Sequence, residues 1–331
     1  MRIIPPLSNV LVIQTAFIGD AILATSVIEK IHQFYPTSNI YFLIRKGNES
    51  LFSGHPFLKE VWTIDKKKKY KSYFDVLLKI RQKKFDLLIN LHRYFSTNLI
   101  ALLSGARLKA GYHKLPFNFF FTSSKKHSIG DGRHETERNH TLIAFITDSK
   151  PARPKLYPAQ TDFQFVDTLK SVKYICLFPA SLWQTKQWPI QKWVELCNRV
   201  QNFKIYLLGG ENDVKVCSEI MKSSINHEIE VLAGKLSLLQ SAALMQFAEM
   251  NFVNDSGPLH IASAMNAPVT AIFCSTITSF GFTPLSDKAL VIQTKEQLAC
   301  RPCGLHGYAI CPKGHFKCGN GIPVEEVFNC L

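Results

Sequence analysis

The feature that most constrains this chain is an alternation of short apolar runs with longer helical segments. In the first half the runs are "NVLVIQ" (9–14), "NIYFLIR" (39–45), "EVWTID" (60–65) and "FDLLINL" (85–91). They are almost continuously apolar, as strands are when both faces of their sheet are covered. Strands that alternate with helices predict βαβ units and a parallel sheet.

The same alternation begins again after a proline-containing segment. Residues 149–162, "SKPARPKLYPAQTD", hold three prolines and little apolar periodicity, which indicates a linker. Strands then recur at 173–180 and 203–210. We therefore predict an α/β protein with two Rossmann-like domains that face a cleft, 1–155 and 156–331. Ligands of such sheets bind beyond the carboxyl ends of the strands.

Charge is unevenly distributed between the two halves. The net charge of +14 comes mainly from residues 1–150, which hold 23 Lys and Arg against 11 Asp and Glu, whereas residues 151–331 hold 16 against 14. The run 65–72 alone is compatible with a solvated basic face, but an excess over a whole domain indicates an anionic partner. The start lacks a signal-peptide pattern and no run suits a bilayer span, so we expect a cytoplasmic protein.

The first polar cluster follows the first predicted strand, in "QTAFIGDAILAT" (14–25). Gly19 permits a tight turn, and Asp20 falls in the first turn of the next helix. Asp20 is compatible with a residue favoured by the helix dipole, or with a carboxylate that accepts a proton at the mouth of a strand. Because the turn is not G-x-G-x-x-G, it gives no support to a nicotinamide dinucleotide site.

Two clusters follow strands of the second half. "FPASLWQTKQWPIQKW" (178–193) carries Ser181, Thr185 and Lys186 before a helix, which suits either an ordinary loop or a phosphate site. "LLGGENDV" (207–214) places Glu211 where it could accept hydrogen bonds from ribose or adenine, although a simple helix start also explains it.

The third cluster of the second half is "NDSGPLHIASAM" (254–265). Asp255 and Ser256 suit helix capping, Gly257 permits close approach of a ligand, and His260 lies one turn beyond Ser256. Together they could bind the phosphates of a nucleotide.

These motifs together resemble one known family. "IGDAILAT", "TKQWP" and "VNDSGPLHIASAMNAPVTAIF", with "STITSFGFTPLS" and the cysteine-rich C-terminal segment, are similar to the ADP-heptose:lipopolysaccharide heptosyltransferases of glycosyltransferase family 9. The resemblance runs from about residue 9 to 328 and implies a GT-B fold. It also implies an inverting transfer with the acceptor bound mainly by the first domain and the nucleotide-sugar by the second.

The resemblance also implies roles for individual residues. Asp20 matches the general base, and Gly19 lies beside it on the acceptor side. No cofactor is required, because Lys186 and helix N-termini would stabilise the leaving group in place of a divalent metal. The implied donor-binding residues are Ser181, Thr185, Lys186, Glu211, Asp255, Ser256, Gly257 and His260.

The implied acceptor is an anionic lipid-linked glycan at the inner face of the inner membrane, with peripheral membrane contact. Its candidate ligands are Arg93, Arg107, Arg133 and Arg138. The chain departs from the family pattern at Ser256, where threonine is commoner, and at Cys274, where glycine is frequent. The serine keeps the hydroxyl, whereas Cys274 could alter the choice of donor.

Five of the nine cysteines lie in the last 32 residues. The spacing of Cys300, Cys303, Cys311 and Cys318 is compatible with a structural zinc ion, with free thiols or with disulfides. A cytosolic location disfavours disulfides.

The prediction is therefore a glycosyltransferase that moves a sugar, expected to be heptose from ADP-heptose, onto a lipopolysaccharide core or related glycan. Three alternatives stay open. One is a GT-B transferase or epimerase that uses a UDP-sugar, and another is a nucleotide-sugar-binding module without catalysis. The last is a basic, zinc-containing nucleic-acid-binding protein, which the lack of aromatic-interleaved basic motifs disfavours.

Overall fold

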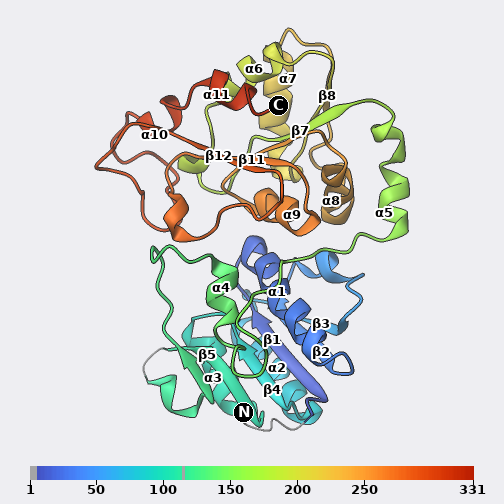
Figure 1. Ribbon diagram of the computed structural model, residues 1–331, viewed down its shortest axis with the longest axis vertical. Helices are drawn as coiled ribbons and strands as arrows, with labels where there is room; N and C mark the ends of the chain where they lie inside the picture. Colours follow the sequence, from blue (N-terminus) through green and yellow to red (C-terminus); the bar gives the residue numbers. More distant parts are fainter. Residues whose placement is uncertain (1–5, 114–115) are drawn as a thin grey trace. The chain divides into compact units, whose positions relative to one another are not determined.

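A computed structural model describes residues 6–113 and 116–331 of the chain. Contacts between Cα atoms divide the chain into two compact units (Figure 1). Unit 1 consists of Met1–Ile129 with Arg133–Tyr157, and unit 2 consists of Gly130–Gly132 with Pro158–Leu331. Each unit is described below by itself.

Unit 1 is built on a parallel six-stranded sheet. Its strands lie in the order β3-β2-β1-β4-β5-β6, and every neighbouring pair is parallel. This is the Rossmann order, which reverses direction between the first and fourth strands. The strands are β1 (Asn9–Gln14), β2 (Asn39–Arg45), β3 (Leu58–Ile64), β4 (Leu87–Asn90), β5 (Leu108–Tyr112) and β6 (Ser123–Lys125).

Helices connect these strands, as the sequence pattern predicts. The helix α1 is buried from Ala21 to Ile31, a stretch that is mainly apolar but includes Glu29 and Lys30. α2 and α3 pack their inner faces on the sheet, where Val76, Ile80, Ile100 and Ala101 join the cluster that contains Leu11 and Leu88. The helical segments are α1 (Ile18–Phe34), η1 (Glu49–Phe52), α2 (Lys69–Lys83), α3 (Phe95–Leu103), η2 (Phe117–Phe120) and α4 (Glu135–His140).

Unit 2 repeats the same topology with a different sequence. Its sheet has the order β12-β11-β10-β7-β8-β9, again parallel throughout, so that the reversal falls between β7 and β10. The strands are β7 (Tyr174–Phe178), β8 (Lys204–Leu207), β9 (Ile229–Val231), β10 (Asn251–Asn254), β11 (Val269–Phe273) and β12 (Ala289–Gln293).

The helices of unit 2 alternate with its strands and continue beyond the last of them. Those between strands are α6 (Ile190–Arg199), α7 (Val214–Ser223), α8 (Leu238–Gln246) and α9 (Gly257–Met265). The remaining helical segments are α5 (Gln160–Phe165), η3 (Asp167–Lys170), η4 (Gln184–Lys186), η5 (Glu211–Asp213), η6 (Thr278–Phe280), α10 (Lys317–Asn320) and α11 (Val324–Phe328).

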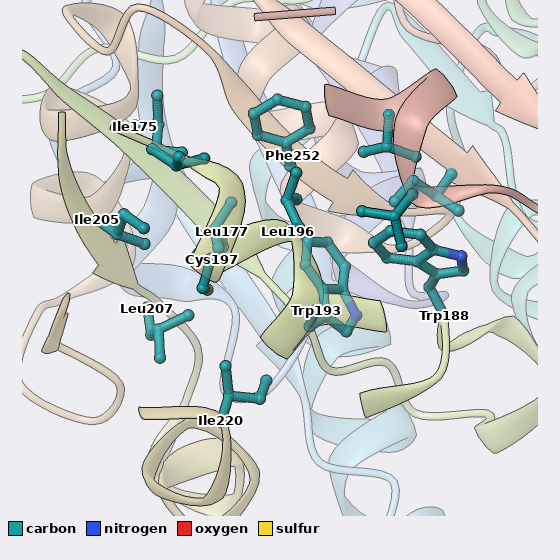
Figure 2. Packing of buried hydrophobic residues seen from close by; sticks show 14 of the residues in the cluster. Ile175, Leu177, Trp188, Trp193, Leu196, Cys197, Ile205, Leu207, Ile220 and Phe252 are labelled. Carbon is teal, nitrogen blue, oxygen red and sulfur yellow. The ribbon is translucent and has the colours of Figure 1, made fainter. Parts of the chain in front are cut away.

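The core of unit 2 is centred on two tryptophans. Trp188 and Trp193 are fully buried and meet edge to face, with ring centroids 5.2 Å apart. Figure 2 shows them beside the strand residues Leu177 and Phe252, which belong to the same cluster. Because Trp188 is the last residue before the Pro189 that opens α6, this burial anchors the polar loop that precedes it.

The predicted parallel sheets are confirmed, but the strands β5, β6, β9 and β12 were not anticipated. β6 and β9 have only three residues each, and "SSK" in β6 carries no apolar signal. Three residues are too few for an apolar or alternating pattern to show in the sequence. Among the described residues, the structure contains no helix with the length and apolar character needed to cross a membrane.

Candidate active site

Unit 1 places a carboxylate beside the reversal point of its sheet. β1 pairs with both β2 and β4, and Asp20 lies in the first turn of the helix that follows β1. Open α/β sheets bind ligands at this point, beyond the carboxyl ends of the central strands. Gly19 lies in the same turn. The position predicted for Asp20 and Gly19 is therefore at the usual ligand edge of the sheet.

The surroundings of Asp20 make it a stronger base than an ordinary aspartate. Burial raises the pKa of Asp20 to about 6, and the negative charge of Glu135 acts in the same direction, while Arg93 opposes them. At neutral pH the carboxylate is ionised but close to its midpoint. A group of this pKa can accept a proton efficiently near pH 7.

Glu135, in the first turn of α4, belongs to a buried chain of charged groups. Its carboxylate lies 3.1 Å from His127 Nε2 and accepts a hydrogen bond from Arg138 Nε at 2.8 Å. Burial raises the pKa of Glu135, but the hydrogen bonds and charges of His127 and Arg138 outweigh burial and hold it below its ordinary range. His127 Nδ1 lies 3.0 Å from the guanidinium of Arg93.

The candidate acceptor arginines thus differ in their settings. Arg93 follows β4 and is exposed, whereas Arg138 is only 1% exposed and directs its guanidinium at Glu135 and at the carbonyl oxygen of Arg133. Arg138 is placed to fix α4 and Glu135. Arg107 lies directly before β5, at the amino end of that strand and not at its carboxyl end. It forms an ion pair with Asp86 at 3.3 Å.

A second contact at the reversal point was not anticipated from the sequence. Thr15, directly after β1, shares a buried hydrogen bond of 2.9 Å between its Oγ1 and Nδ1 of His92, directly after β4. The bond ties the two central strand ends together. The sequence signal was available in principle, since both residues follow the ends of predicted strands.

Unit 2 places an ion pair at the equivalent point of its own sheet. Lys186 follows β7 and Asp255 follows β10, and Lys186 Nζ lies 2.7 Å from Asp255 Oδ2. Both side chains are largely buried, at 15% and 8% exposure. Thr276 donates a further hydrogen bond of 2.6 Å to the same carboxylate oxygen. The lysine is thus held in one place at the ligand edge of the sheet.

Asn254 fixes the loop that carries Lys186. Its Oδ1 accepts the backbone N–H of Trp188 at 2.9 Å, and its Nδ2 donates to the carbonyl oxygens of Phe178 and Pro179. The side chain is fully buried. One amide at the end of β10 therefore satisfies the polar backbone at the end of β7, which joins the two clusters that the sequence shows separately.

The segment 255–260 forms the start of α9. Ser256 is the N-cap residue, but within the described structure its hydroxyl lies 3.4 Å from the carbonyl oxygen of Asn254 and does not cap the helix. Gly257 opens the helix and adds no side chain there. His260 is buried in the first turn beside Phe282. The free N–H groups of a helix start and its dipole favour an anion.

The cysteine-rich segment packs directly against Thr185. Thr185 Oγ1 accepts the backbone N–H of Tyr308 at 2.8 Å, and Thr185 N–H donates to the carbonyl oxygen of Tyr308 at 3.1 Å. Gly307 has a φ of +81°, and a Cβ there would lie 2.9 Å from Thr185 Oγ1 and 3.3 Å from Lys186 Cγ. Thr185 is thus a buried structural contact, and Gly307 permits the close approach.

Two predicted donor residues, Glu211 and Ser181, have contacts with residues other than Lys186 and Asp255. Glu211 opens the short helix η5 after β8 and is exposed, and it approaches Gly234. Ser181 accepts a hydrogen bond at its carbonyl oxygen from the side chain of Gln187. Both lie in loops after strand ends.

The structural-zinc prediction receives no support. In the described part of the chain, which includes all four cysteines, no three His, Cys, Asp or Glu side chains are grouped to hold a metal ion. All nine cysteines are free thiols. Burial raises the pKa of the Cys318 thiol to about 11. Cys303 donates to the carbonyl oxygen of Cys300 at 3.5 Å.

Two parallel sheets of the Rossmann order, each with polar side chains at its reversal point, are the architecture of the GT-B fold. The model of glycosyltransferase family 9 (heptosyltransferase) matches residues 74–306. The chain belongs to this family, and it is therefore a glycosyltransferase.

Individual relatives agree with this assignment. The lipopolysaccharide core heptosyltransferase OpsX of Haemophilus influenzae is 25% identical over 280 residues, covering 79% of this chain and 78% of the relative. The crystal structure of a family 9 glycosyltransferase from Veillonella parvula has a TM-score of 0.83 and 22% identity, covering 99% of this chain and 97% of that one. The ADP-heptose lipopolysaccharide heptosyltransferase II of Escherichia coli has a TM-score of 0.75 and 21% identity over 93% and 96%.

Proposed function

We propose that this chain transfers heptose from ADP-heptose to a lipopolysaccharide core acceptor, with inversion at the anomeric carbon and Asp20 as the general base. The observation that carries the proposal is the raised pKa of Asp20, about 6, at the ligand edge of unit 1. The names of the similar proteins support the choice of donor and acceptor, since they are heptosyltransferases of lipopolysaccharide.

Unit 2 binds the donor in this proposal. Lys186 has three N–H donors, of which one faces Asp255, and the others can reach the oxygens of the donor diphosphate. The start of α9, with Ser256 and Gly257, supplies backbone N–H groups to the same diphosphate. Glu211 and His260 contact the nucleoside and the sugar, and Ser181 and Thr185 shape the loop around Lys186.

Unit 1 binds the acceptor, and the reaction is a single displacement. Asp20 takes the proton of the acceptor hydroxyl. At the same time, the oxygen of that hydroxyl forms a bond to the anomeric carbon of heptose. The bond from that carbon to the diphosphate oxygen breaks, and ADP leaves with the electron pair. Lys186 and the helix start neutralise the charge that develops on ADP, so the transfer needs no cofactor.

The acceptor is anionic and lipid-linked, and it lies at the inner face of the cytoplasmic membrane. The excess of positive charge in residues 1–150 supports this choice, because phosphate and carboxylate groups of such an acceptor are attracted to it. Arg93 is exposed, and its charge lowers the pKa of Asp20, so it is the first candidate to bind an anionic group of the acceptor.

The test is an assay of purified protein with ADP-heptose and a core acceptor, followed by ADP release and by mass spectrometry of the glycan. Asp20→Asn should lower kcat about 10²- to 10⁴-fold, because the proton acceptor is lost, and should leave the Kd for ADP unchanged. The control Asp75→Asn removes an exposed carboxylate of α2 and should retain full activity.

Lys186→Ala should raise the KM for ADP-heptose, because the phosphates lose a charged partner. NMR of the product gives the anomeric configuration. If the Asp20→Asn variant transfers heptose at an unchanged rate, Asp20 is not the base. A product with retained anomeric configuration would exclude the single displacement. Binding of a UDP-sugar but not of ADP-heptose would replace the proposed donor.

A further inference from the structure

Two neighbouring helices of unit 1 carry apolar side chains on their outer faces. On α2 these are Tyr70, Phe74 and Leu78, and on α3 they are Phe95, Leu99 and Leu103, and all six are exposed. In each helix the three residues are four positions apart, which places them on one face. We call these six residues the apolar stripes. The hydrophobic core does not account for these six residues, because α2 and α3 contribute other residues to it.

The two stripes lie side by side. Tyr73 near the start of α2 accepts a hydrogen bond from Ser96 near the start of α3, at 3.1 Å. Arg81 near the end of α2 donates to the carbonyl oxygen of Leu103 at the end of α3, at 3.3 Å. The helices therefore run parallel, and both pack on the same face of the sheet. Their outer faces form one continuous surface.

A third element extends this surface. The short helix η2 contacts α3, and its Phe119 is 78% exposed. Large apolar side chains on three adjacent elements form a patch of the kind that marks an interaction site, whereas single exposed apolar residues need no explanation.

The surface is bordered by positive charge. Residues 66–84 hold nine Lys and Arg and a single acidic residue, Asp75. Lys67, Lys68 and Lys71 are exposed at the start of α2, and Arg81, Lys83 and Lys84 are exposed at its end. Glu60 forms ion pairs with Lys79 and Lys83 and offsets part of this charge.

We propose that this face of unit 1 docks on a bilayer that contains anionic phospholipids. The apolar stripes and Phe119 would enter the interface between headgroups and acyl chains, while the flanking lysines would contact lipid phosphates. Docking rests on the proposed function in one respect, namely that the lipid-linked acceptor lies in a membrane. Docking would bring the enzyme to that acceptor.

The charge pattern favours lipid over another occupant. A second copy of the chain would bring two surfaces with the same excess of positive charge together, and like charges across an interface oppose association. An anionic lipid surface matches both halves of the pattern, since it offers phosphates to the lysines and an apolar layer to the stripes.

The test is sedimentation of the full chain with vesicles of phosphatidylglycerol and phosphatidylcholine at 30:70, compared with phosphatidylcholine alone. The chain should bind the anionic vesicles at least tenfold more tightly, and added salt should weaken this binding. Phe74→Ser with Leu99→Ser, and separately Lys67→Gln with Lys68→Gln and Lys71→Gln, should each weaken it about tenfold or more.

Matched controls come from unit 2. Ile225→Ser removes an apolar side chain that is more exposed than Phe74 or Leu99, and Lys173→Gln with Lys215→Gln and Lys222→Gln removes three exposed lysines. Both variants should bind as the wild type does. Circular dichroism and activity on a water-soluble, deacylated acceptor should be unchanged in all four variants. Asp20→Asn should bind vesicles normally, which separates docking from the proposed chemistry.

Three results would overturn the inference. One is equal binding of the wild type to both kinds of vesicle, and another is unchanged binding by both stripe and lysine variants. The third is a wild-type dimer in sedimentation velocity that Phe74→Ser with Leu99→Ser converts to a monomer, since this would assign the surface to self-association.

Discussion

Asp20 shows how a single carboxyl group acquires its character from residues that are distant in sequence. Glu135 is 115 positions further along the chain, yet its charge raises the pKa of Asp20, and Arg93 and Lys66 interact with the same carboxylate. His127 and Arg138 keep Glu135 ionised. The basicity of Asp20 is thus a property of its burial and of the charged groups that surround it.

A pH profile follows from this network. The base must be deprotonated, so kcat/KM should be half-maximal near the pKa of Asp20, about 6, should level off about one pH unit above it, and should fall about tenfold per pH unit well below it. Glu135→Gln removes a negative charge that raises this pKa, so the acid limb should move to lower pH. Initial rates between pH 4.5 and 8.5 measure both effects.

The control for this profile is Asp148→Asn, which removes an acidic charge of unit 1 that pairs with Lys30. Asp148 does not contribute to the pKa of Asp20 in this structure, so the acid limb should stay in place. An acid limb that Glu135→Gln leaves unmoved would refute the coupling.

At the scale of elements, the loop 303–308 supports the loop that carries Lys186. The backbone of Tyr308 donates one hydrogen bond to Thr185 Oγ1 and accepts another from Thr185 N–H, and Cys303 N–H donates to the carbonyl oxygen of Ser275 at 2.9 Å. Arg301 reinforces this support by donating to the carbonyl oxygens of Phe273 and Thr276. The cysteine-rich segment thus braces the donor loop through backbone contacts.

Gly307→Ala should disturb this support. The new Cβ would lie 2.9 Å from Thr185 Oγ1 and 3.1 Å from Ser275 Oγ, so the loops must separate. We expect the KM for ADP-heptose to rise several-fold with a smaller change in kcat, because Lys186 is displaced while Asp20 is not. Steady-state kinetics with varied donor concentration measures this.

Gly314→Ala is the matched control. Gly314 has a similar φ of +71°, but nothing lies within 4 Å of a Cβ there, so it carries the same backbone strain without the contact. Its donor KM should stay at the wild-type value. Equal effects of the two substitutions would assign the loss to strain and not to the position of Lys186.

At the scale of the whole molecule, two units of the same topology have separate hydrophobic cores. The core of unit 1 is built around Trp62, and that of unit 2 around Trp188 and Trp193. Three of the four tryptophans belong to unit 2, so tryptophan fluorescence mainly reports on the unfolding of this unit. Proteins of this kind often unfold in more than one step.

ADP should therefore stabilise one unit selectively. A ligand at one hundred times its Kd adds about 2.7 kcal/mol to the stability of the state that binds it. We expect ADP to raise the Tm seen by tryptophan fluorescence by several degrees, and Lys186→Ala to abolish the increase. Calorimetry should resolve a second transition, that of unit 1, at an unchanged Tm. A shift confined to that second transition would place the nucleotide in the wrong unit.

Most of the fold could be predicted from the sequence because a buried parallel strand has a strong local signal. "NVLVIQ" and "VTAIF" are apolar throughout, and β1 and β11 form there. β6 and β9 gave no such signal, because each has only three residues. The three donor clusters were found because polar residues directly after apolar strands interrupt a local pattern.

Two series of βα units, and the polar residues at their strand ends, can be read from local sequence patterns. Which distant residues meet depends on the folded sheets, which bring Lys186 to Asp255 and Asn254 to the loop before Trp188. Folding likewise brings Glu135 to His127 and Arg138. It also decided that the four cysteines do not form a metal site among the described residues. The physical reason is that strand formation depends on local hydrophobicity, whereas ion pairs and pKa values depend on distances between segments that the folded sheets bring together.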